Sequence, residues 1–253
     1  MSEGPRIALV VPCFDEAARL DGEAFLAFAR DHADVRLLFV DDGSTDATAA
    51  RLDALAAERP EQIRVRRLPE NRGKGEAVRA GLLAVRADAP RYAGYWDADL
   101  STPLAFALEL AEHLDRHPGL WLAAGSRTLM LGRPIERHAW RHYLGRVAAT
   151  LVSLTLEAPV YDSQCGAKLL RCSAGLDAWI AEPFASRWLF DVELLARIAR
   201  AEGGPPAAAL HRRVHEVPVP AWQHVAGSKV RTGDLLRLPL ELLRIRRALQ
   251  GRR

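Results

Sequence analysis

Short apolar runs alternate with helical patterns through the first half of the chain. Apolar runs bounded by turn residues are expected to be strands, whereas apolar residues that recur every three or four positions predict a helix. The expected strands are residues 6–13, 63–68, 91–96, 120–126 and the apolar first part of 35–44, which ends in polar turn residues from Asp41 on. The expected helices are 16–30, 47–58, 73–86 and a fourth that Pro103 opens as its first residue. Strands that are buried on both faces and alternate with helices predict an α/β fold, with a mostly parallel sheet flanked by helices.

The second half of the chain follows this pattern less regularly. We expect a helix over 135–157, a strand over 167–172, a helix over 191–202 and a strand over 213–220. There is no internal repeat and only a short Gly/Pro break, so a single domain over residues 1–230 with a tail over 231–253 is the economical prediction. Either Thr45 or Asp46 is expected to cap the second helix.

The composition fits a globular chain and excludes several classes of protein. The 253 residues are 49% hydrophobic and 26% charged, which is enough to bury a substantial core. A formal net charge of +3 is too small to predict nucleic-acid binding, so no nucleic-acid partner is expected. The N-terminus lacks the features of a signal peptide, and no segment approaches the length of about 18 apolar residues that predicts a membrane span.

The cysteines and histidines do not predict a metal site or a disulfide framework. Three cysteines form no C-x-x-C pair, and a reducing cytoplasm is the simplest setting for them. Among the histidines, His138 and His142 have a spacing that a helix could use for zinc, but a pair among arginines more often lies on a solvated face. The other histidines considered are His211, His215 and His224, and they form no convincing metal spacing.

Acidic side chains follow three of the expected strands, at the point where each strand ends. The carboxyl ends of parallel strands meet at one edge of a sheet, where α/β folds bind their ligands. The acids are Asp15, Glu16, Asp41, Asp42, Asp97 and Asp99. Crowded carboxylates need a cation or a donor-rich ligand, and their oxygens suit Mg²⁺ or Mn²⁺ that is shared with the phosphates of a substrate.

Each of these features has a simpler explanation when it is taken alone. An Asp-x-Asp sequence such as 97–99 is often a turn with solvated carboxylates, and Asp42 would suit a helix N-cap. The glycine-rich stretch 70–81 is neither a Walker A loop nor a dinucleotide fingerprint. It carries Lys74, and it is either a cationic helix start that approaches phosphates or an ordinary helix N-terminus.

Seven motifs in order resemble one enzyme family. "VVPCFDE", "FVDDGSTDAT", "NRGKGEAVRAG" and "DADLSTP" look like family 2 glycosyltransferases with a GT-A-type fold. "DSQCGAKLLR", "RWLFDVELL" and "GSKV" resemble the polyprenyl-phosphate glycosyltransferases, and most closely the dolichyl-phosphate β-glucosyltransferases. The chain departs from this family in lacking the membrane helices of many relatives. It also has Ala167 where an aromatic residue is usual, which bears on the acceptor pocket.

The resemblance implies a UDP-sugar donor held by the first motifs. Asp42 would accept a hydrogen bond from the uracil imide N–H, and Asp99 would ligate Mg²⁺ or Mn²⁺ with Asp97 beside it. Glu16 would contact the ribose or the base. The other residues implied on the nucleotide side are Pro12, Asp15, Lys74, Gln164 and Lys168.

The acceptor implied by the later motifs is a polyprenyl phosphate. A phosphate monoester has a second pKa of about 6, so it is a nucleophile at neutral pH and needs cations more than a general base. The candidate cations are Arg127, Arg137, Arg141, Lys168 and Lys229. A solvated helix face would equally explain Arg137 and Arg141. Asp162 and Asp191 would orient a cation or act as a base, and Asp191 would also suit a helix cap.

The tail is basic and amphipathic. Leu235, Leu238, Leu242, Ile245 and Leu249 recur on one helical face, and seven arginines face two acids over 231–253. Pro239 predicts two helical pieces or a helix that starts there. We expect the tail to lie on a membrane surface in place of the missing spans, and a core helix is the alternative.

The sequence therefore predicts an inverting, metal-dependent transfer of a hexose, glucose in the first instance, from a UDP-sugar to a polyprenyl phosphate. Candidate catalytic residues are Arg127, Asp162, Asp191 and Lys229. The expected location is the cytoplasm, with the tail on the cytoplasmic face of the membrane. The alternatives are a soluble acceptor or a sugar-nucleotide-binding module without turnover, whereas a nicotinamide dehydrogenase is excluded because no G-x-G-x-x-G follows the first strand.

Overall fold

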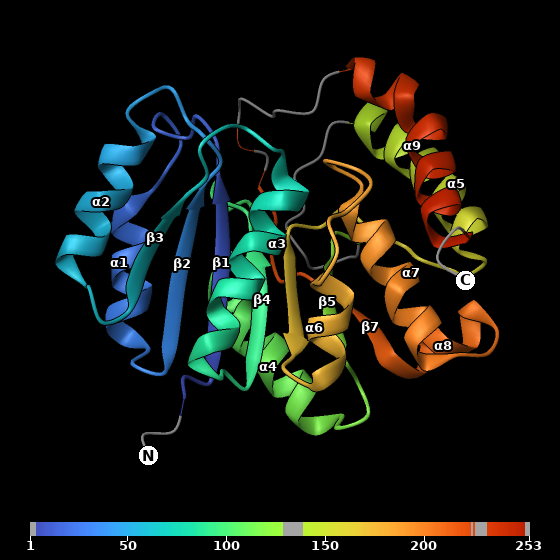
Figure 1. Ribbon diagram of the computed structural model, residues 1–253, viewed down its shortest axis with the longest axis horizontal. Coiled ribbons are helices and arrows are strands. Elements are labelled where there is room, and N and C mark those ends of the chain that lie inside the picture. The colour runs from blue at the N-terminus through green and yellow to red at the C-terminus, as the bar shows by residue number, and fades with distance from the viewer. Residues whose placement is uncertain (1–3, 129–138, 224, 226–231, 251–253) are drawn as a thin grey trace.

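The computed structural model describes residues 4–128, 139–223, 225 and 232–250, which form one sheet with helices on both faces (Figure 1). The strands are β1 (Ile7–Cys13), β2 (Val35–Asp41), β3 (Ile63–Arg67), β4 (Tyr92–Trp96), β5 (Leu122–Ser126), β6 (Ala167–Arg171) and β7 (Val214–Pro218). The helices are α1 (Gly22–Asp31), α2 (Thr48–Glu58), α3 (Lys74–Val85), α4 (Phe106–Arg116), α5 (Ala139–Leu156), α6 (Ala174–Ile180), α7 (Phe190–Glu202), α8 (Pro206–Arg213) and α9 (Thr232–Gln250), with a 3₁₀ turn η1 (Arg86–Asp88). The α/β prediction is confirmed.

The sheet has the strand order β3-β2-β1-β4-β6-β5-β7. β1 pairs in parallel with both β2 and β4, and β5 pairs in parallel with β7. β6 runs antiparallel to both of its neighbours, β4 and β5, with Tyr95 opposite Lys168. This reversal brings the segment just before β6 to the carboxyl end of β4, so that residues 162–166 lie beside residues 96–99.

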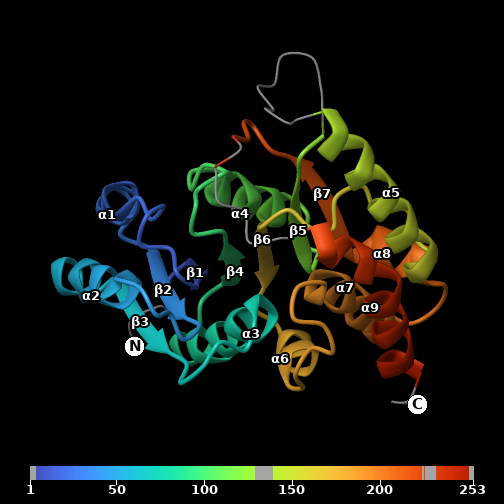
Figure 2. The same ribbon diagram turned by 90° about the horizontal axis from the view of Figure 1, so that it is seen from above.

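Alternate side chains of the central strands pack into two separate cores, one on each face of the sheet. On one face Leu9 and Val11 of β1 pack with residues from α1, α2 and α4. On the other face Val10 packs with residues from α3, α6 and α7, and this core extends to α5, α8 and α9 (Figure 2). Burial on both faces explains why these strands are apolar throughout.

Two predicted helix starts are wrong, and each has a local reason. α1 begins at Gly22 rather than at residue 16, because the Asp21 side chain caps it by accepting from the Ala24 N–H at 3.0 Å. α4 begins at Phe106 rather than at Pro103, since the Phe106 N–H reaches only the carbonyl three residues back, at 3.1 Å. α2 begins at Thr48 with Ala47 as its N-cap residue, and the side chain of Asp46, one of the two predicted caps, accepts from the Thr48 N–H at 2.9 Å. Neither α6 nor α8 was predicted.

The tail forms one helix, α9, that continues through Pro239, so the prediction of a break there is wrong. Leu238, Leu242 and Ile245 are buried in the same core as α5 and α7. A proline removes one backbone hydrogen bond from a helix and destabilises it. Burying each of these three side chains contributes about 1.5–3 kcal/mol to the stability of the fold, which offsets that loss. The apolar face of the tail therefore packs on the protein, which corrects the expectation that this face contacts a membrane.

Candidate active site

The loops that follow β1 and β2 are joined by the side chain of Asp15. Its Oδ1 accepts hydrogen bonds from the backbone N–H of Thr45 at 2.8 Å and of Asp46 at 3.3 Å. Its own N–H donates to the Ser44 hydroxyl at 3.0 Å, and its φ of 48° is left-handed. Pro12 lies within β1, one residue before the end of the strand. Two of the predicted acidic strand ends therefore form one connected edge.

Asp42 anchors the glycine-rich loop to the end of β2. Its two carboxylate oxygens accept from the backbone N–H groups of Arg72 and Gly73, each at 2.8 Å, and the residue is 2% exposed. Burial raises the pKa of Asp42, although these two hydrogen bonds oppose the rise. Asp42 does not cap α2, which begins six residues later at Thr48. The carboxylate thus holds the loop that leads to Lys74.

A partly buried arginine that the sequence analysis missed links the acids of the first and fourth strands. Arg19 makes a bidentate ion pair with Glu16, with N···O distances of 2.8 and 2.6 Å. The remaining guanidinium nitrogen of Arg19, Nη1, lies 3.6 Å from Oδ2 of Asp99. Arg19 was overlooked because residues 16–20 were assigned to an amphipathic helix, whereas they form a turn over the edge of the sheet. The spacing of three residues from Glu16 was the available signal.

Asp97 and Lys74 form an ion pair at the centre of the edge, with an N···O distance of 2.6 Å. Burial alone would lower the pKa of the Lys74 ammonium, but the carboxylates around it, first Asp97 and then Asp191 and Asp99, raise it. Burial would raise the pKa of Asp97, but Lys74 and other cations lower it below its ordinary value. Both groups are therefore charged at neutral pH.

Lys168 lies beneath this edge and is 1% exposed. Its ammonium donates to the carbonyls of Ser163 (2.9 Å) and Cys165 (2.6 Å) and to Oδ1 of Asp191 (2.6 Å). The same Asp191 oxygen accepts from the hydroxyl of Tyr95. Three acceptors match the three N–H groups of a lysine, so Lys168 and Asp191 bind each other and the backbone rather than facing the cleft.

Arg127 and Asp162 form a second, partly buried pair at the end of β5. The guanidinium binds the carboxylate in a bidentate manner, with both N···O distances 2.7 Å, and the Arg127 backbone N–H adds a third hydrogen bond at 2.9 Å. Burial would lower the pKa of Arg127, but the Asp162 carboxylate raises it. Glu216 on β7 accepts from the Asp162 N–H at 2.6 Å, and the Arg127 guanidinium lies 5.6 Å from the centre of the Trp222 ring.

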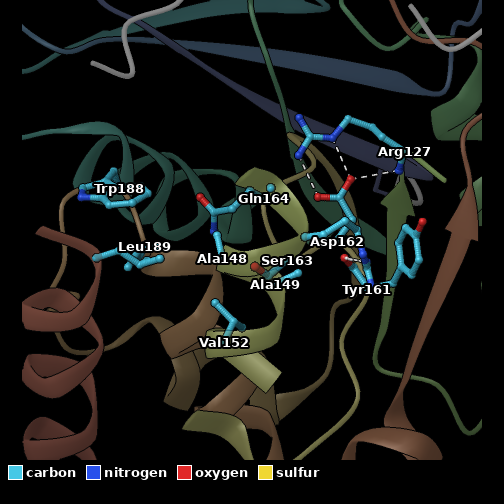
Figure 3. A pocket seen from close by; sticks show the side chains of 13 residues that line it. Arg127, Ala148, Ala149, Val152, Tyr161, Asp162, Ser163, Gln164, Trp188 and Leu189 are labelled. Carbon is cyan, nitrogen blue, oxygen red and sulfur yellow. Dashed lines mark hydrogen bonds and ion pairs between the residues drawn. The ribbon is translucent and has the colours of Figure 1, made fainter. Parts of the chain in front are cut away.

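A pocket of about 190 Å³ opens beside this pair (Figure 3). Arg127 and Asp162 line one end of it, and the walls are largely apolar and come from α5, α9 and the segment before α7. The apolar lining residues are Ala148, Ala149, Val152, Trp188, Leu189 and Leu238. Gln164 also lines the pocket, and its Nε2 is buried without a hydrogen-bond partner among the described residues. A buried unpaired N–H donor suits a ligand with an acceptor oxygen.

Three predicted cations lie wholly or partly beyond what the structure describes. Lys229 and Arg137 fall outside the described residues, and Arg141 is described only as part of the helix α5. The structure therefore brings together Asp15, Asp42, Lys74, Asp97 and Asp99 along one edge, and Arg127, Asp162 and Gln164 at the neighbouring pocket.

The acidic edge, which is the end of the sheet that carries Asp15, Asp42, Asp97 and Asp99, fits a hard divalent cation. Asp99 is 19% exposed at its side chain, and its Oδ1 is oriented by the Ser101 N–H at 3.1 Å. Within the part of the chain that the structure describes, its Oδ2 makes only the 3.6 Å contact with Arg19, so this oxygen remains within reach of a further ligand. Carboxylate oxygens are the donors that Mg²⁺ and Mn²⁺ prefer.

The mostly parallel sheet flanked by helices has the GT-A-type fold of glycosyltransferases, and the comparisons agree. The sequence model of glycosyl transferase family 2 matches residues 8–174. The chain therefore belongs to glycosyltransferase family 2 and is a glycosyltransferase.

Similar curated proteins carry one name, dolichyl-phosphate beta-glucosyltransferase. The mouse (Mus musculus) protein is 32% identical over 89% of this chain and 69% of its own length. The Drosophila melanogaster protein is 31% identical over 88% of this chain and 69% of its own length. The Saccharomyces cerevisiae protein is 29% identical over 96% of this chain and 74% of its own length.

Solved structures share the fold. Glucosyl-3-phosphoglycerate synthase from Mycobacterium tuberculosis, crystallised with Mn²⁺, UDP and glucosyl-3-phosphoglycerate, has a TM-score of 0.65 and 18% identity over 98% of this chain and 81% of its own. Another crystal structure, described as that of a mycobacterial protein, has a TM-score of 0.69 and 19% identity over 98% of this chain and 76% of its own. At these identities the likeness shows the fold alone.

Proposed function

We propose that this enzyme transfers glucose from UDP-glucose to a polyprenyl phosphate, with inversion at the anomeric carbon and with Mg²⁺ or Mn²⁺ as cofactor. The observation that carries the proposal is the apolar pocket that ends at Arg127, Asp162 and the unpaired Gln164 amide. An apolar wall beside a cation suits an acceptor that joins a hydrocarbon chain to a phosphate. The names of the similar proteins support the same acceptor class.

The donor occupies the edge between β1, β2 and β4. Pro12, Asp15 and the loop held by Asp42 line the base pocket, and Asp42 has a second lone pair on each oxygen with which to accept the uracil N–H. Glu16 acts through Arg19, because its carboxylate is bound to that guanidinium. Lys74 lies next to Asp97, where it balances the charge of the diphosphate.

Asp99, with Asp97 beside it, would hold the metal ion. When bound, the ion supplies positive charge that stabilises the departing diphosphate. Arg19 and Lys74 add positive charge at the same edge, since each contacts one of these two carboxylates.

The reaction is a single displacement. An oxygen of the acceptor phosphate attacks the anomeric carbon from the face opposite UDP, the bond from that carbon to the diphosphate breaks, and UDP leaves with the electron pair. A phosphate monoester is largely a dianion at neutral pH, so no proton needs to be removed. Arg127 lies at the pocket end where it offsets the repulsion between acceptor and donor phosphates.

Asp162, Asp191 and Lys168 position other groups in this proposal. Asp162 orients Arg127 through three hydrogen bonds. Asp191 and Lys168 support the floor of the site from below, since both are buried and bound to each other. The earlier expectations of a base at Asp191 and of a phosphate contact at Lys168 are replaced by these roles.

The acceptor is reached at a membrane surface, through the outer faces of α5 and α9. Leu154 is 70% exposed, Leu240 62%, Val147 58% and Leu243 47%, and the two helices pack side by side (Figure 1). Three exposed arginines accompany these residues on α9: Arg244, Arg246 and Arg247. Exposed apolar and basic side chains on adjacent helices suit an anionic lipid surface. No helix among the described residues is long and apolar enough to cross a membrane.

The test is a panel of UDP- and GDP-sugars with a short polyprenyl phosphate or with 3-phosphoglycerate, read by mass spectrometry. We expect glucosyl polyprenyl phosphate from UDP-glucose, with inverted anomeric configuration by NMR, and loss of the product in EDTA or with Asp99→Asn. Product from 3-phosphoglycerate alone would establish the soluble acceptor. Binding of UDP-glucose without any product would establish a binding module.

A further inference from the structure

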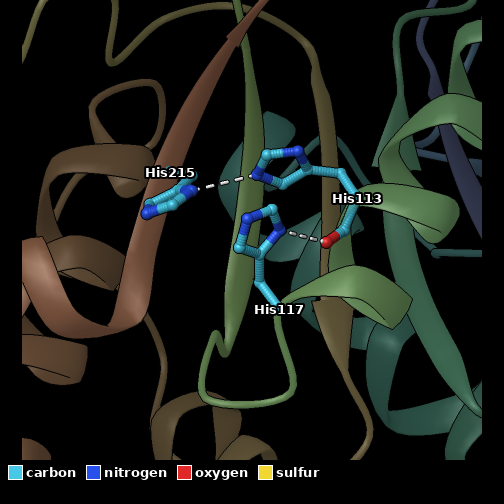
Figure 4. A group of neighbouring side chains, drawn as sticks. All are labelled: His113, His117 and His215. Carbon is cyan, nitrogen blue, oxygen red and sulfur yellow. Dashed lines mark hydrogen bonds between the residues drawn. The ribbon is translucent and has the colours of Figure 1, made fainter.

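Three histidines meet near the end of the sheet where β5 and β7 begin (Figure 4). The acidic residues lie at the other end of the strands. His113 lies in the last turn of α4, His117 is the residue after it that caps the helix, and His215 is the second residue of β7. His215 pairs with Ala123 near the start of β5, whereas Arg127 follows the end of that strand. The histidine cluster is therefore separate from the proposed active site.

The ring nitrogens converge on a common point. His113 Nε2 lies 3.0 Å from His215 Nδ1, and one nitrogen from each of the three rings falls within 4.8 Å of the others. Two nitrogens bound to one tetrahedral zinc ion, at bonds of about 2.0–2.1 Å, are about 3.3 Å apart. The His113–His215 pair thus already has nearly the spacing that such an ion requires, whereas the nitrogen of the third ring would have to move closer to both.

The third ring is oriented by a backbone hydrogen bond. His117 Nδ1 lies 2.8 Å from the carbonyl oxygen of His113, to which it donates. That bond leaves Nε2 of His117 as the nitrogen with a lone pair, and in Figure 4 this nitrogen points toward the ring of His113. A hydrogen bond from one ring nitrogen to a carbonyl is the arrangement that orients histidine ligands at metal sites.

We propose that His113, His117 and His215 bind a divalent transition-metal ion of the zinc type, with the fourth position open to water. Three imidazole nitrogens form a borderline-soft ligand set that favours zinc over Mg²⁺ or Ca²⁺. The bound ion joins the end of α4 to the edge strand β7. It therefore stabilises that edge of the sheet and leaves the acidic edge free for a harder ion.

The charged groups around the three histidines are compatible with a bound metal ion. Arg116 is a nearby positive charge, but its Nε donates to the carbonyl of Glu112 at 3.3 Å, back along the helix. Burial lowers the pKa of both His113 and His215.

The experiment is equilibrium dialysis of the full chain, stripped with EDTA, against zinc in a buffer with millimolar Mg²⁺ to occupy the acidic edge. Bound zinc is counted by mass spectrometry of the metal. We expect one zinc ion per chain, at least tenfold weaker zinc binding in His113→Ala and in His215→Gln, and unchanged binding in His211→Ala. His211 is the matched control because it is exposed and lies four residues before His215.

A second measurement uses the thermal stability of the chain instead of the amount of bound metal. Zinc, and not added Mg²⁺, should raise the melting temperature of the wild-type chain, and the gain should vanish in His215→Gln. The proposal is overturned if zinc does not bind above the Mg²⁺ background, if His211→Ala weakens binding as much as His215→Gln, or if zinc stabilises His215→Gln as much as the wild type.

Discussion

The carboxylate of Asp97 lies directly against the Cα atom of Gly166. A Cβ atom on Gly166 would lie 1.8 Å from Oδ2 of Asp97, and the Asp97 N–H donates to the Gly166 carbonyl at 3.1 Å. The residue before β6 therefore determines where the carboxylate at the end of β4 points. This contact exists because β6 runs antiparallel beside β4.

Gly166→Ala should move the Asp97 carboxylate and leave most of the fold intact. A displacement of about 1 Å in a catalytic site lowers turnover by roughly 100-fold, so we expect a loss of that order in glucosyl transfer, with weaker UDP binding in the presence of Mg²⁺. Gly119→Ala is the matched control, because the nearest atom to its Cβ would be 3.9 Å away. Equal activities of the two variants, measured by UDP release, would contradict the positioning of Asp97 by Gly166.

Lys168→Met should destabilise the protein strongly, because it leaves the Asp191 carboxylate buried without its cation. Breaking a buried ion pair costs about 3–5 kcal/mol. The free energy of unfolding in urea measures this, with Arg64→Met as the control, since Arg64 pairs with Asp88 at an exposed site and should change stability by less than about 1 kcal/mol. A Lys168→Met protein that is as stable as wild type but no longer binds phosphate would instead make Lys168 a ligand-binding residue.

Lys74→Met should change how stability depends on pH. In the wild type the pKa of Asp97 is lowered, so its ionisation stabilises the fold above the unfolded pKa, and this contribution disappears as the pH falls through the folded pKa. Without Lys74, burial is opposed by the smaller effects of Arg127 and Lys168, so the pKa of Asp97 should be higher than in the wild type. The variant should then gain less stability than the wild type as the pH rises from about 3 to 6. Urea titrations in EDTA measure the difference, and parallel pH curves for the two proteins would exclude this electrostatic coupling.

Replacing Leu154 and Leu240 by serine should weaken attachment to anionic vesicles, because it removes the two most exposed of these apolar side chains on α5 and α9. Losing this apolar area should lower the vesicle-bound fraction by roughly tenfold, with little effect on UDP affinity. Leu83→Ser is the control, since Leu83 is 41% exposed but lies on α3. Co-sedimentation reads the result, and equal pelleting of all three proteins would place the lipid contact elsewhere.

The alternation of apolar and helical segments was sufficient to predict the first five strands and the acidic edge. Parallel strands with helical connections repeat a local pattern, and carboxylates at their ends need no long-range information. The direction of β6 was not predictable, since the sequence of a five-residue strand gives no sign of whether it pairs in parallel or antiparallel.

Side-chain pairing explains what the sequence analysis missed. Lys168 and Asp191 are 23 residues apart, so their ion pair depends on tertiary packing, and the lysine was assigned to a phosphate. Arg19 was hidden in a stretch with helical periodicity. The amphipathic pattern of α9 was correctly recognised, but periodicity alone does not tell whether the apolar face meets a membrane or the core.

Leu238 of α9 lines the pocket beside Arg127 and Asp162, whereas the strands of the acidic edge, β1, β2, β4 and β6, all precede α9 in the chain. A chain is synthesised from its N-terminus. Under the proposed function, the residues that bind the donor are therefore made before the helix that supplies one wall of the acceptor pocket. A variant truncated before α9 would keep the donor residues and lose the wall that Leu238 provides.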